Sequence, residues 1–158
     1  MKEIECIGQT RRSFCTQAAT LALLGGTAAL ALSGCGGGPT SPSDVSSLPS
    51  VNAARTGGVT TLAIDVGSPL AAVGSAARVV TSGGNFLVAR TGQEAFVALA
   101  AICTHETCAI TGFSNQTYVC PCHGSTFDLN GRVLGGPAPT ALRQYATLFT
   151  GGVLTITG

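Results

Sequence analysis

Histidine is scarce in this chain of 158 residues, which contains only His105 and His123. Both lie in short cysteine-containing segments, CTHETC at residues 103–108 and CPCHGS at residues 120–125. Because these segments use both imidazoles, none remains for a second histidine metal site or for a Ser/His or Cys/His catalytic pair. The sequence therefore predicts one chemically specialised site and no catalytic residue.

Charge is also scarce. Asp, Glu, Lys and Arg together make up 9% of the chain, and the formal net charge is +1. After Gly34 the arginines and the acidic residues balance, and no basic stripe is present. Proteins that bind nucleic acid need a basic face to neutralise phosphates. The composition therefore argues against nucleic acid as a partner.

Long runs with helical periodicity are absent, since none reaches ten residues. Short β-prone runs recur instead, and glycine or proline separates most of them. We expect strands at residues 59–66, 85–90, 95–101, 116–120, 146–149 and 153–157. We expect turns at residues 67–69, 83–85, 135–139 and 151–152. This pattern predicts an all-β antiparallel fold for residues 59–158.

Cysteine and histidine are brought together by the two segments, which hold four of the seven cysteines. Thiolates and imidazoles bind both zinc and iron–sulfur clusters. A structural zinc ion could use two of each, but the CxH spacing is unusual for zinc and one cysteine pair stays unused. An absorption spectrum of the purified protein distinguishes the two interpretations, because a zinc protein is colourless and an iron–sulfur protein is not.

The two segments resemble the ligand loops of Rieske proteins, in which two thiolates hold one iron of a [2Fe–2S] cluster and two imidazoles hold the other. The resemblance implies one such cluster. It implies that Cys103 and Cys120 bind one iron, and that His105 and His123 bind the second. FSNQTYV, residues 113–119, then supplies a strand that returns the second loop beside the first.

The remaining pair, Cys108 and Cys122, stands where Rieske proteins of the cytochrome bc and b6f type carry a disulfide between the two loops. The resemblance is to that branch, and it implies a small antiparallel β sandwich with both loops at one end. Such a disulfide closes a loop of about 15 residues, worth ~3 kcal/mol in the chain-entropy model. It also requires an oxidising compartment.

Two positions near the second loop bear on the cluster's potential. In bc-type Rieske proteins a serine and a tyrosine donate hydrogen bonds that raise it. Ser125 matches the serine, whereas Phe127 replaces the tyrosine. Glu106 stands beside His105 where the family motif has leucine, and we expect its charge to lower the potential and make the docking tip polar.

The segment GGPAP, residues 135–139, matches a proline loop that covers the cluster in bc-type domains. Taken alone it predicts an ordinary turn. Its separation from Ser125 along the sequence, and the neighbouring segment FDLNGR, favour the interpretation as the family's proline loop. The resemblance thus assigns Gly136, Pro137 and Pro139 to a cluster-covering loop.

Residues 1–35 read as an export leader. TRRSF at residues 10–14 precedes a weakly apolar stretch, which is typical of a twin-arginine signal for folded proteins. LSGC resembles a lipoprotein processing box and predicts lipidation of Cys35. The alternative is an uncleaved leader that serves as the anchor, although the apolar run is short for a spanning helix.

Residues 36–58 are rich in Gly, Ser, Pro and Thr and predict a disordered linker. The expected organisation is therefore a leader at residues 1–35, a linker at 36–58 and a Rieske domain at 59–158. Both interpretations of the leader tether the domain to the outer, periplasmic face of the cytoplasmic membrane.

The resemblance implies electron transfer with redox partner proteins. Three roles stay open: the iron–sulfur subunit of a quinol to cytochrome c or plastocyanin oxidoreductase, the small subunit of a periplasmic molybdenum enzyme such as arsenite oxidase, and a free lipoprotein carrier. The disulfide pair and GGPAP favour the first role, in which cytochromes are the partner proteins and quinol is the electron donor. Glu106 and the lipobox favour the other two.

Overall fold

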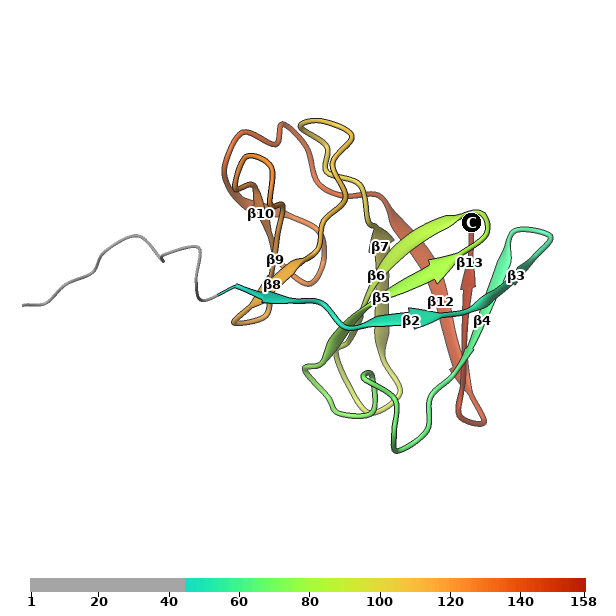
Figure 1. The fold of residues 1–158 in the computed structure, drawn as a ribbon. Helices are drawn as coiled ribbons and strands as arrows, with labels where there is room; N and C mark the ends of the chain where they lie inside the picture. Colours follow the sequence, from blue (N-terminus) through green and yellow to red (C-terminus); the bar gives the residue numbers. More distant parts are fainter. Residues whose placement is uncertain (1–44) are drawn as a thin grey trace, which may run out of the picture. The chain divides into compact units, whose positions relative to one another are not determined.

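The computed structural model describes residues 45–158, and every regular element in that range is a β-strand (Figure 1). The prediction of an all-β fold is thus confirmed. The strands are β1 (Ser46–Ser47), β2 (Ser50–Asn52), β3 (Ala54–Thr56), β4 (Val59–Ala63), β5 (Ala76–Thr81), β6 (Gly84–Arg90), β7 (Phe96–Ala100), β8 (Gly112–Ser114), β9 (Thr117–Val119), β10 (Thr126–Phe127), β11 (Val133–Gly135), β12 (Gln144–Thr150) and β13 (Val153–Thr157).

The larger sheet has eight strands in the order β2-β5-β6-β7-β12-β13-β4-β3. Its pairs are antiparallel except for β2 and β5, which run parallel. Burial alternates along β12 and β13, as expected when one face of a sheet is covered. The covered face holds an apolar core that includes Leu70, Val88 and Leu154. The turn that the sequence predicts at Gly151 and Gly152 joins β12 to β13, and both glycines have positive φ.

The smaller sheet has five strands in the order β1-β8-β9-β10-β11 and carries the two cysteine segments. One of its faces packs on a second core, in which Ile110, Tyr118 and Phe127 are fully buried. Cys103 and Cys120 belong to this same core. The apolar side chains of the smaller sheet therefore pack against the cysteines of the candidate site.

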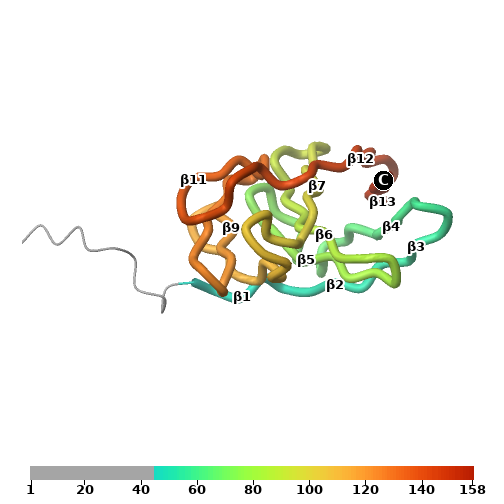
Figure 2. The backbone as a smooth tube through the Cα atoms, turned by 90° about the horizontal axis from the view of Figure 1, so that it is seen from above, coloured from blue at the N-terminus to red at the C-terminus, as the bar shows by residue number. Residues whose placement is uncertain are grey.

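The expectation of a linker up to residue 58 differs from the structure, because residues 45–58 contain three strands. β1 pairs with β8, β2 with β5 and β3 with β4. In Figure 2 this segment runs along one side of the domain, from the smaller sheet to the larger. Leu48 anchors it, since its side chain is 7% exposed within the second core. Pairing and burial offset the low β propensity of Ser and Pro.

The segment Phe113–Val119 also differs from its prediction as one return strand. It forms a hairpin of β8 and β9, with the turn at Asn115 (φ 49°) and Gln116 (φ 59°). Positive φ at both central residues is the geometry of a two-residue hairpin turn, in which asparagine is favoured. β5 was not expected, because its sequence begins with two alanines and holds an arginine.

The predicted leader, the lipidation of Cys35 and the first part of the linker lie outside the described residues. Within residues 45–158, the structure has no helix that is both long and apolar enough to cross a membrane.

Candidate metal centre

Two loops form the candidate site, and main-chain hydrogen bonds fix each of them. The first loop connects β7 to β8 and is closed by bonds from Cys103 N to Cys108 O and from Ile110 N to Ala101 O, both 2.8 Å. The second connects β9 to β10, and the N–H of Cys120 donates to Ser125 O at 2.8 Å. These bonds hold Cys103 three residues after the end of β7, and Cys120 directly after the end of β9.

Cys103 and Cys120 come together in the core, with side chains 5% and 1% exposed. They are the cysteines of the described range that form no disulfide. Burial is the largest single influence and raises the pKa of the Cys103 thiol. The main chains of His105 and Glu106 and the side chains of Cys120 and Ser125 lower it, and together they bring the pKa of Cys103 below its usual value. Burial, followed by the nearby Cys103, raises the pKa of Cys120. One thiol of this pair is therefore prepared to ionise first.

His105 and His123 form a second pair at the outer side of the loops. Their ring centroids are 4.8 Å apart and the rings are nearly perpendicular, at 89°. Nδ1 of His105 is buried and has no hydrogen-bond partner. An unpaired buried nitrogen costs free energy unless something else binds it, and a metal ion can fill that role. The position of this atom fits a metal-binding imidazole.

A disulfide joins Cys108 in the first loop to Cys122 in the second. The predicted pairing is therefore present in the structure. Cys122 is exposed and Cys108 is half-buried, so the bridge lies at the surface side of the two loops. It holds His105 and His123 near one another by linking the loops that carry them.

Ser125 and Phe127 are both fully buried beside this site. The Ser125 hydroxyl accepts a hydrogen bond from the main-chain N–H of Ala138, at 3.1 Å. Phe127 lies in the same core as Cys103 and is the cross-strand neighbour of Tyr118. The Tyr118 hydroxyl is buried without a partner, and burial raises the pKa of Tyr118.

Glu106 lies at the tip of the first loop, where its side chain is 62% exposed. The sequence places it next to His105, but its carboxylate also lies 3.9 Å from Nδ1 of His123. The carboxylate therefore adds negative charge beside both imidazoles, not beside one.

The segment from Gly135 to Pro139 packs directly on the second loop. A Cβ atom on Gly136 would lie 2.5 Å from Cα of Ser125, and φ of Gly136 is +85°. Only glycine fits both the close approach and the backbone angle. The Thr104 hydroxyl donates a 2.6 Å hydrogen bond to Thr140 O, which ties the end of this segment to the first loop.

Sequence analysis missed two groups at this site: the Thr104 hydroxyl and the Ala138 amide. Thr104 stands inside the CTHETC motif as an ordinary spacer residue. A main-chain N–H has no signature in sequence, because every residue other than proline carries one. Only the folded loops reveal either contact.

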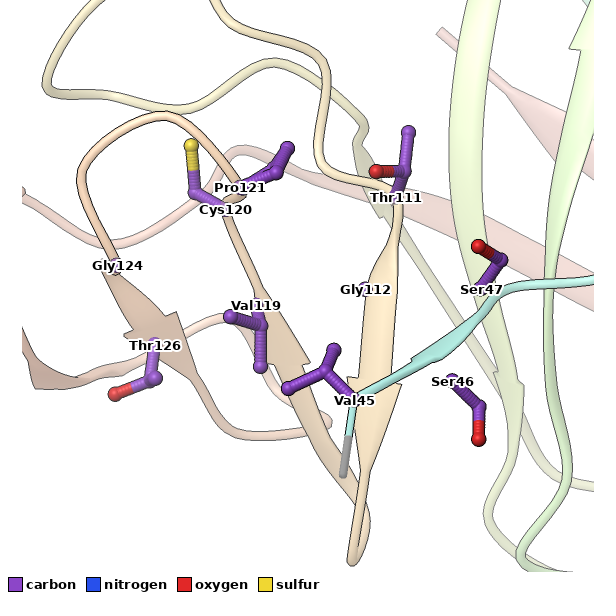
Figure 3. A pocket seen from close by; sticks show the side chains of 10 residues that line it. All are labelled: Val45, Ser46, Ser47, Thr111, Gly112, Val119, Cys120, Pro121, Gly124 and Thr126. Carbon is purple, nitrogen blue, oxygen red and sulfur yellow. The ribbon is translucent and has the colours of Figure 1, made fainter. Parts of the chain in front are cut away.

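A pocket of about 500 Å³ lies on the smaller sheet behind the second loop (Figure 3). Its lining is mostly apolar and includes Val45, Val119 and Pro121. Cys120 reaches its edge, but neither histidine lines it. The pocket is therefore a feature of the supporting sheet, separate from the pair of imidazoles.

The donor set can be tested against a single zinc ion. Tetrahedral zinc with Zn–S bonds of ~2.3 Å requires ligand atoms about 3.7 Å from one another. Among the described residues, the groups of three whose ligand atoms lie within 4.8 Å are Cys108, Cys120 and Cys122, and His105, Glu106 and His123. Two sulfurs of the first group form the disulfide, and neither group joins a free thiol to an imidazole. A thiol pair set apart from an imidazole pair fits a two-iron cluster better than one ion.

A family model described as the Rieske [2Fe-2S] domain matches residues 66–146, about half of the chain. Curated proteins with similar sequences are named as iron-sulfur subunits. The cytochrome b6-f complex iron-sulfur subunit of Chlorobaculum thiosulfatiphilum is 36% identical over 63 residues, which are 39% of this chain and 35% of the relative. The subunit of the same name from Prochlorococcus marinus strain MIT 9301 is 44% identical over 57 residues, 35% of this chain and 32% of that protein. The matched segment spans about a third of these relatives.

Two solved structures are similar to this chain. The plasma membrane Rieske protein PetC3 from Synechocystis PCC 6803 is 32% identical, with a TM-score of 0.47, and the match covers 52% of this chain and 86% of that one. Naphthalene 1,2-dioxygenase with indole bound is 17% identical, with a TM-score of 0.51 over 61% of this chain and 25% of that one, a likeness in fold alone. With its disulfide, its paired thiols and its paired imidazoles, this chain belongs to the Rieske [2Fe-2S] domain family and binds one [2Fe-2S] cluster.

Proposed function

We propose that this chain transfers electrons as the iron–sulfur subunit of a membrane oxidoreductase of the cytochrome b6f type. The observation that carries the proposal is the site itself: a buried thiol pair and an imidazole pair on two loops joined by a disulfide. The curated relatives named as cytochrome b6-f iron-sulfur subunits support it. Cytochrome-type proteins are then the partners.

We assign Cys103 and Cys120 to one iron and His105 and His123 to the other. When bound, the cluster takes up and releases one electron, at a potential of about −150 to +300 mV for this ligand type. The low pKa of Cys103 prepares one thiol for metal binding, since ligands bind as thiolates. The unpaired Nδ1 of His105 supplies a nitrogen ligand that the fold leaves free.

The surrounding residues tune and protect this centre. A hydroxyl that donates to a ligand sulfur stabilises the more negative, reduced state, which is the role we assign to Ser125. The segment carrying Gly136, Pro137 and Pro139 covers the second loop, and the disulfide covers the exposed side. Together they exclude water from the thiol pair, which strengthens the electrostatic effect of each donor.

Phe127→Tyr is expected to raise the cluster's reduction potential. Phe127 is fully buried in the core that holds both candidate thiols, at the position where bc-type Rieske proteins carry the tyrosine that donates to the cluster. A redox titration followed by circular dichroism measures the shift. Tyr118→Phe, which removes a hydroxyl from the cross-strand neighbour, is the matched control and should leave the potential nearly unchanged. An unchanged potential in Phe127→Tyr would contradict the placement of Phe127 next to the cluster.

We further propose that residues 1–35 act as a twin-arginine leader and that Cys35 is lipidated, which places the domain on the periplasmic face of the membrane. The disulfide supports an oxidising compartment. Because β1 begins at Ser46, the tether between Cys35 and the domain is shorter than the sequence alone predicts. An uncleaved leader is the alternative, and mass spectrometry of the mature protein distinguishes the two.

A free lipoprotein carrier, or the small subunit of a molybdenum enzyme such as arsenite oxidase, is the second candidate. One observation favours it: the exposed carboxylate of Glu106 lies at the tip, 3.9 Å from Nδ1 of His123. A charged tip is poorly suited to docking an apolar quinol. Direct oxidation of quinol is therefore the least supported part of the first proposal.

Glu106→Gln is expected to raise the potential, because removing a negative charge beside the imidazoles favours the reduced state. The side chain is 62% exposed, so water and salt screen its charge. We expect less than a tenfold change in the reduction equilibrium, and a smaller one at high ionic strength. Glu94→Gln, an exposed carboxylate in the turn between β6 and β7, is the control. Equal shifts in both variants would show that Glu106 has no special position.

Isolation of the intact protein from detergent-solubilised membranes tests the proposed role. Co-purification with b- and c-type cytochromes supports the b6f-type subunit. Co-purification with a molybdenum protein supports the second candidate, and recovery of the protein alone supports the free carrier. Either of the last two results would overturn the first proposal.

A further inference from the structure

A third sulfur lies beside the disulfide. The Sγ atoms of Cys108, Cys120 and Cys122 all lie within 4.8 Å of one another. Cys108 and Cys122 form the bridge, whereas Cys120 is free. Figure 3 shows the Cys120 sulfur pointing toward the second loop and away from the strands. A free thiol therefore lies next to a bond that thiols can break.

The reaction open to this arrangement is thiol–disulfide exchange, in which a thiolate attacks one sulfur of a disulfide and expels the other. The attacking sulfur must close from within 4.8 Å to the ~2.0 Å of an S–S bond, and rotation of cysteine side chains moves sulfurs over such a gap. Among residues 45–158, Cys103 forms no comparable group with both disulfide sulfurs. Cys120 is therefore the nucleophile that the fold supplies.

The position of each cysteine decides which sulfur is attacked. Attack on Cys122 would join two residues that only Pro121 separates, which makes a short and strained ring. Attack on Cys108 would still join the first loop to the second, and it closes a loop of nearly the same length as the native bridge. It expels Cys122, whose side chain is exposed, so water stabilises the departing thiolate. Cys108 is therefore the favoured target.

Main-chain hydrogen bonds hold both cysteines that would be joined. The N–H of Cys108 donates to Glu106 O at 2.7 Å, and its carbonyl accepts the bond from Cys103 N. The N–H of Cys120 donates to Ser125 O at 2.8 Å. Exchange between side chains breaks none of these bonds. Both loops can thus keep their main-chain structure while the sulfurs change partners.

We propose that in the cluster-free chain the Cys120 thiolate attacks Sγ of Cys108, which converts the native bridge into a Cys108–Cys120 disulfide and a free thiol at Cys122. One S–S bond forms and one breaks, and the electron pair of the broken bond leaves on Sγ of Cys122. Cys120 loses its proton to water and Cys122 takes one up. The step is redox-neutral and needs no oxidant or reductant.

Cluster binding and this exchange exclude one another, because both use the sulfur of Cys120. This link rests on the proposed assignment of Cys120 as an iron ligand. A ligand that binds only one of two forms shifts the chain toward that form, so a bound cluster preserves the native bridge. A chain that loses its cluster keeps its loops joined but loses one of its four ligands. The pairing of the disulfide thus depends on whether the cluster is bound.

Alkylation with iodoacetamide tests the exchange, because the labelled cysteine identifies the free thiol. The native pairing leaves Cys103 and Cys120, whose side chains are 5% and 1% exposed, whereas exchange leaves the exposed Cys122. In the cluster-free chain we expect about tenfold more label at Cys122 than at the two buried thiols. The cluster-loaded chain should carry almost none there. Mass spectrometry of unreduced peptides should also find the Cys108–Cys120 bridge.

The sample is the full chain with Cys6, Cys15 and Cys35 changed to serine, so that no thiol outside the described residues takes part. A chelator removes the iron, and desalting removes the sulfide that could otherwise reduce the bridge. Burial raises the pKa of the Cys120 thiol and makes its thiolate scarce, so the labelling is followed over hours.

Two matched variants separate exchange from opening of the fold. Cys120→Ser removes the nucleophile and should abolish the label at Cys122. Cys103→Ser removes the other buried thiol and should retain it. Label at Cys122 that persists in Cys120→Ser, the absence of label at Cys122, or equal labelling of all free thiols by an unfolded chain would overturn the proposal. A chain that never binds a cluster refutes the proposed function, yet label at Cys122 would still report the exchange.

Discussion

Cys120→Ser is expected to abolish the cluster. The thiol is 1% exposed and directly follows β9. The sulfurs of Cys108 and Cys122 lie within 4.8 Å of it, but their disulfide keeps them from replacing it as a thiolate ligand. Serine keeps the size of the side chain but does not supply a soft thiolate. Iron and acid-labile sulfide should both fall from two per chain to background, and the visible absorption should disappear. His123→Ala should give the same loss from the nitrogen side.

The matched control for this prediction is Cys35→Ser, a cysteine outside the described residues, which should keep full iron and sulfide. Far-ultraviolet circular dichroism checks that the ligand variants still fold as β proteins. A folded Cys120→Ser protein that retains two irons and two sulfides would contradict the ligand assignment. Retained iron without sulfide would favour a mononuclear site instead.

Removing the disulfide is expected to cause the largest loss of stability. The bridge joins residues separated by 14 positions in sequence, and the chain-entropy model assigns such a loop ~3 kcal/mol. For a domain of about 100 residues this corresponds to a fall in Tm of about 12–24 °C. The double variant Cys108→Ala and Cys122→Ala avoids an unpaired thiol. Thermal unfolding followed by circular dichroism measures the difference.

A chemical reductant supplies the control for the disulfide. Because Cys122 is exposed, reductant should lower the Tm of the parent protein toward that of the double variant. It should leave the Tm of the double variant unchanged. Equal Tm values for parent and variant without reductant would show that the bridge does not stabilise the fold.

The candidate site could be located from sequence because its chemistry is local. Each segment, CTHETC and CPCHGS, holds its donors within six residues, so their separation is fixed by the chain itself. The position of β13 could be predicted from alternating apolar residues, and the turn at Gly151 from its glycines. Both are also local signals. The pairing of Cys108 with Cys122 came from the family resemblance, and the structure forms it.

The rest depended on contacts between distant parts of the chain. The serine-rich segment at residues 45–58 is ordered because Leu48 is buried and β2 adds to β5, which no local pattern reveals. The Ala138 amide reaches Ser125 across 13 positions, and only packing at Gly136 brings them together. Glu106 lies near His123 because the disulfide joins their loops. Contacts between residues distant in sequence therefore determine these features, and local secondary-structure propensity does not predict them.

Pulsed EPR of the reduced protein tests the mixed nitrogen and sulfur ligation most directly. The method detects magnetic nuclei bound to the paramagnetic centre, so it reports nitrogen ligands without relying on activity. We predict strong coupling to two histidine nitrogens, which shifts when histidine is labelled with ¹⁵N. A reduced protein with no signal, or with a [2Fe–2S] signal that lacks nitrogen coupling, would contradict ligation by His105 and His123.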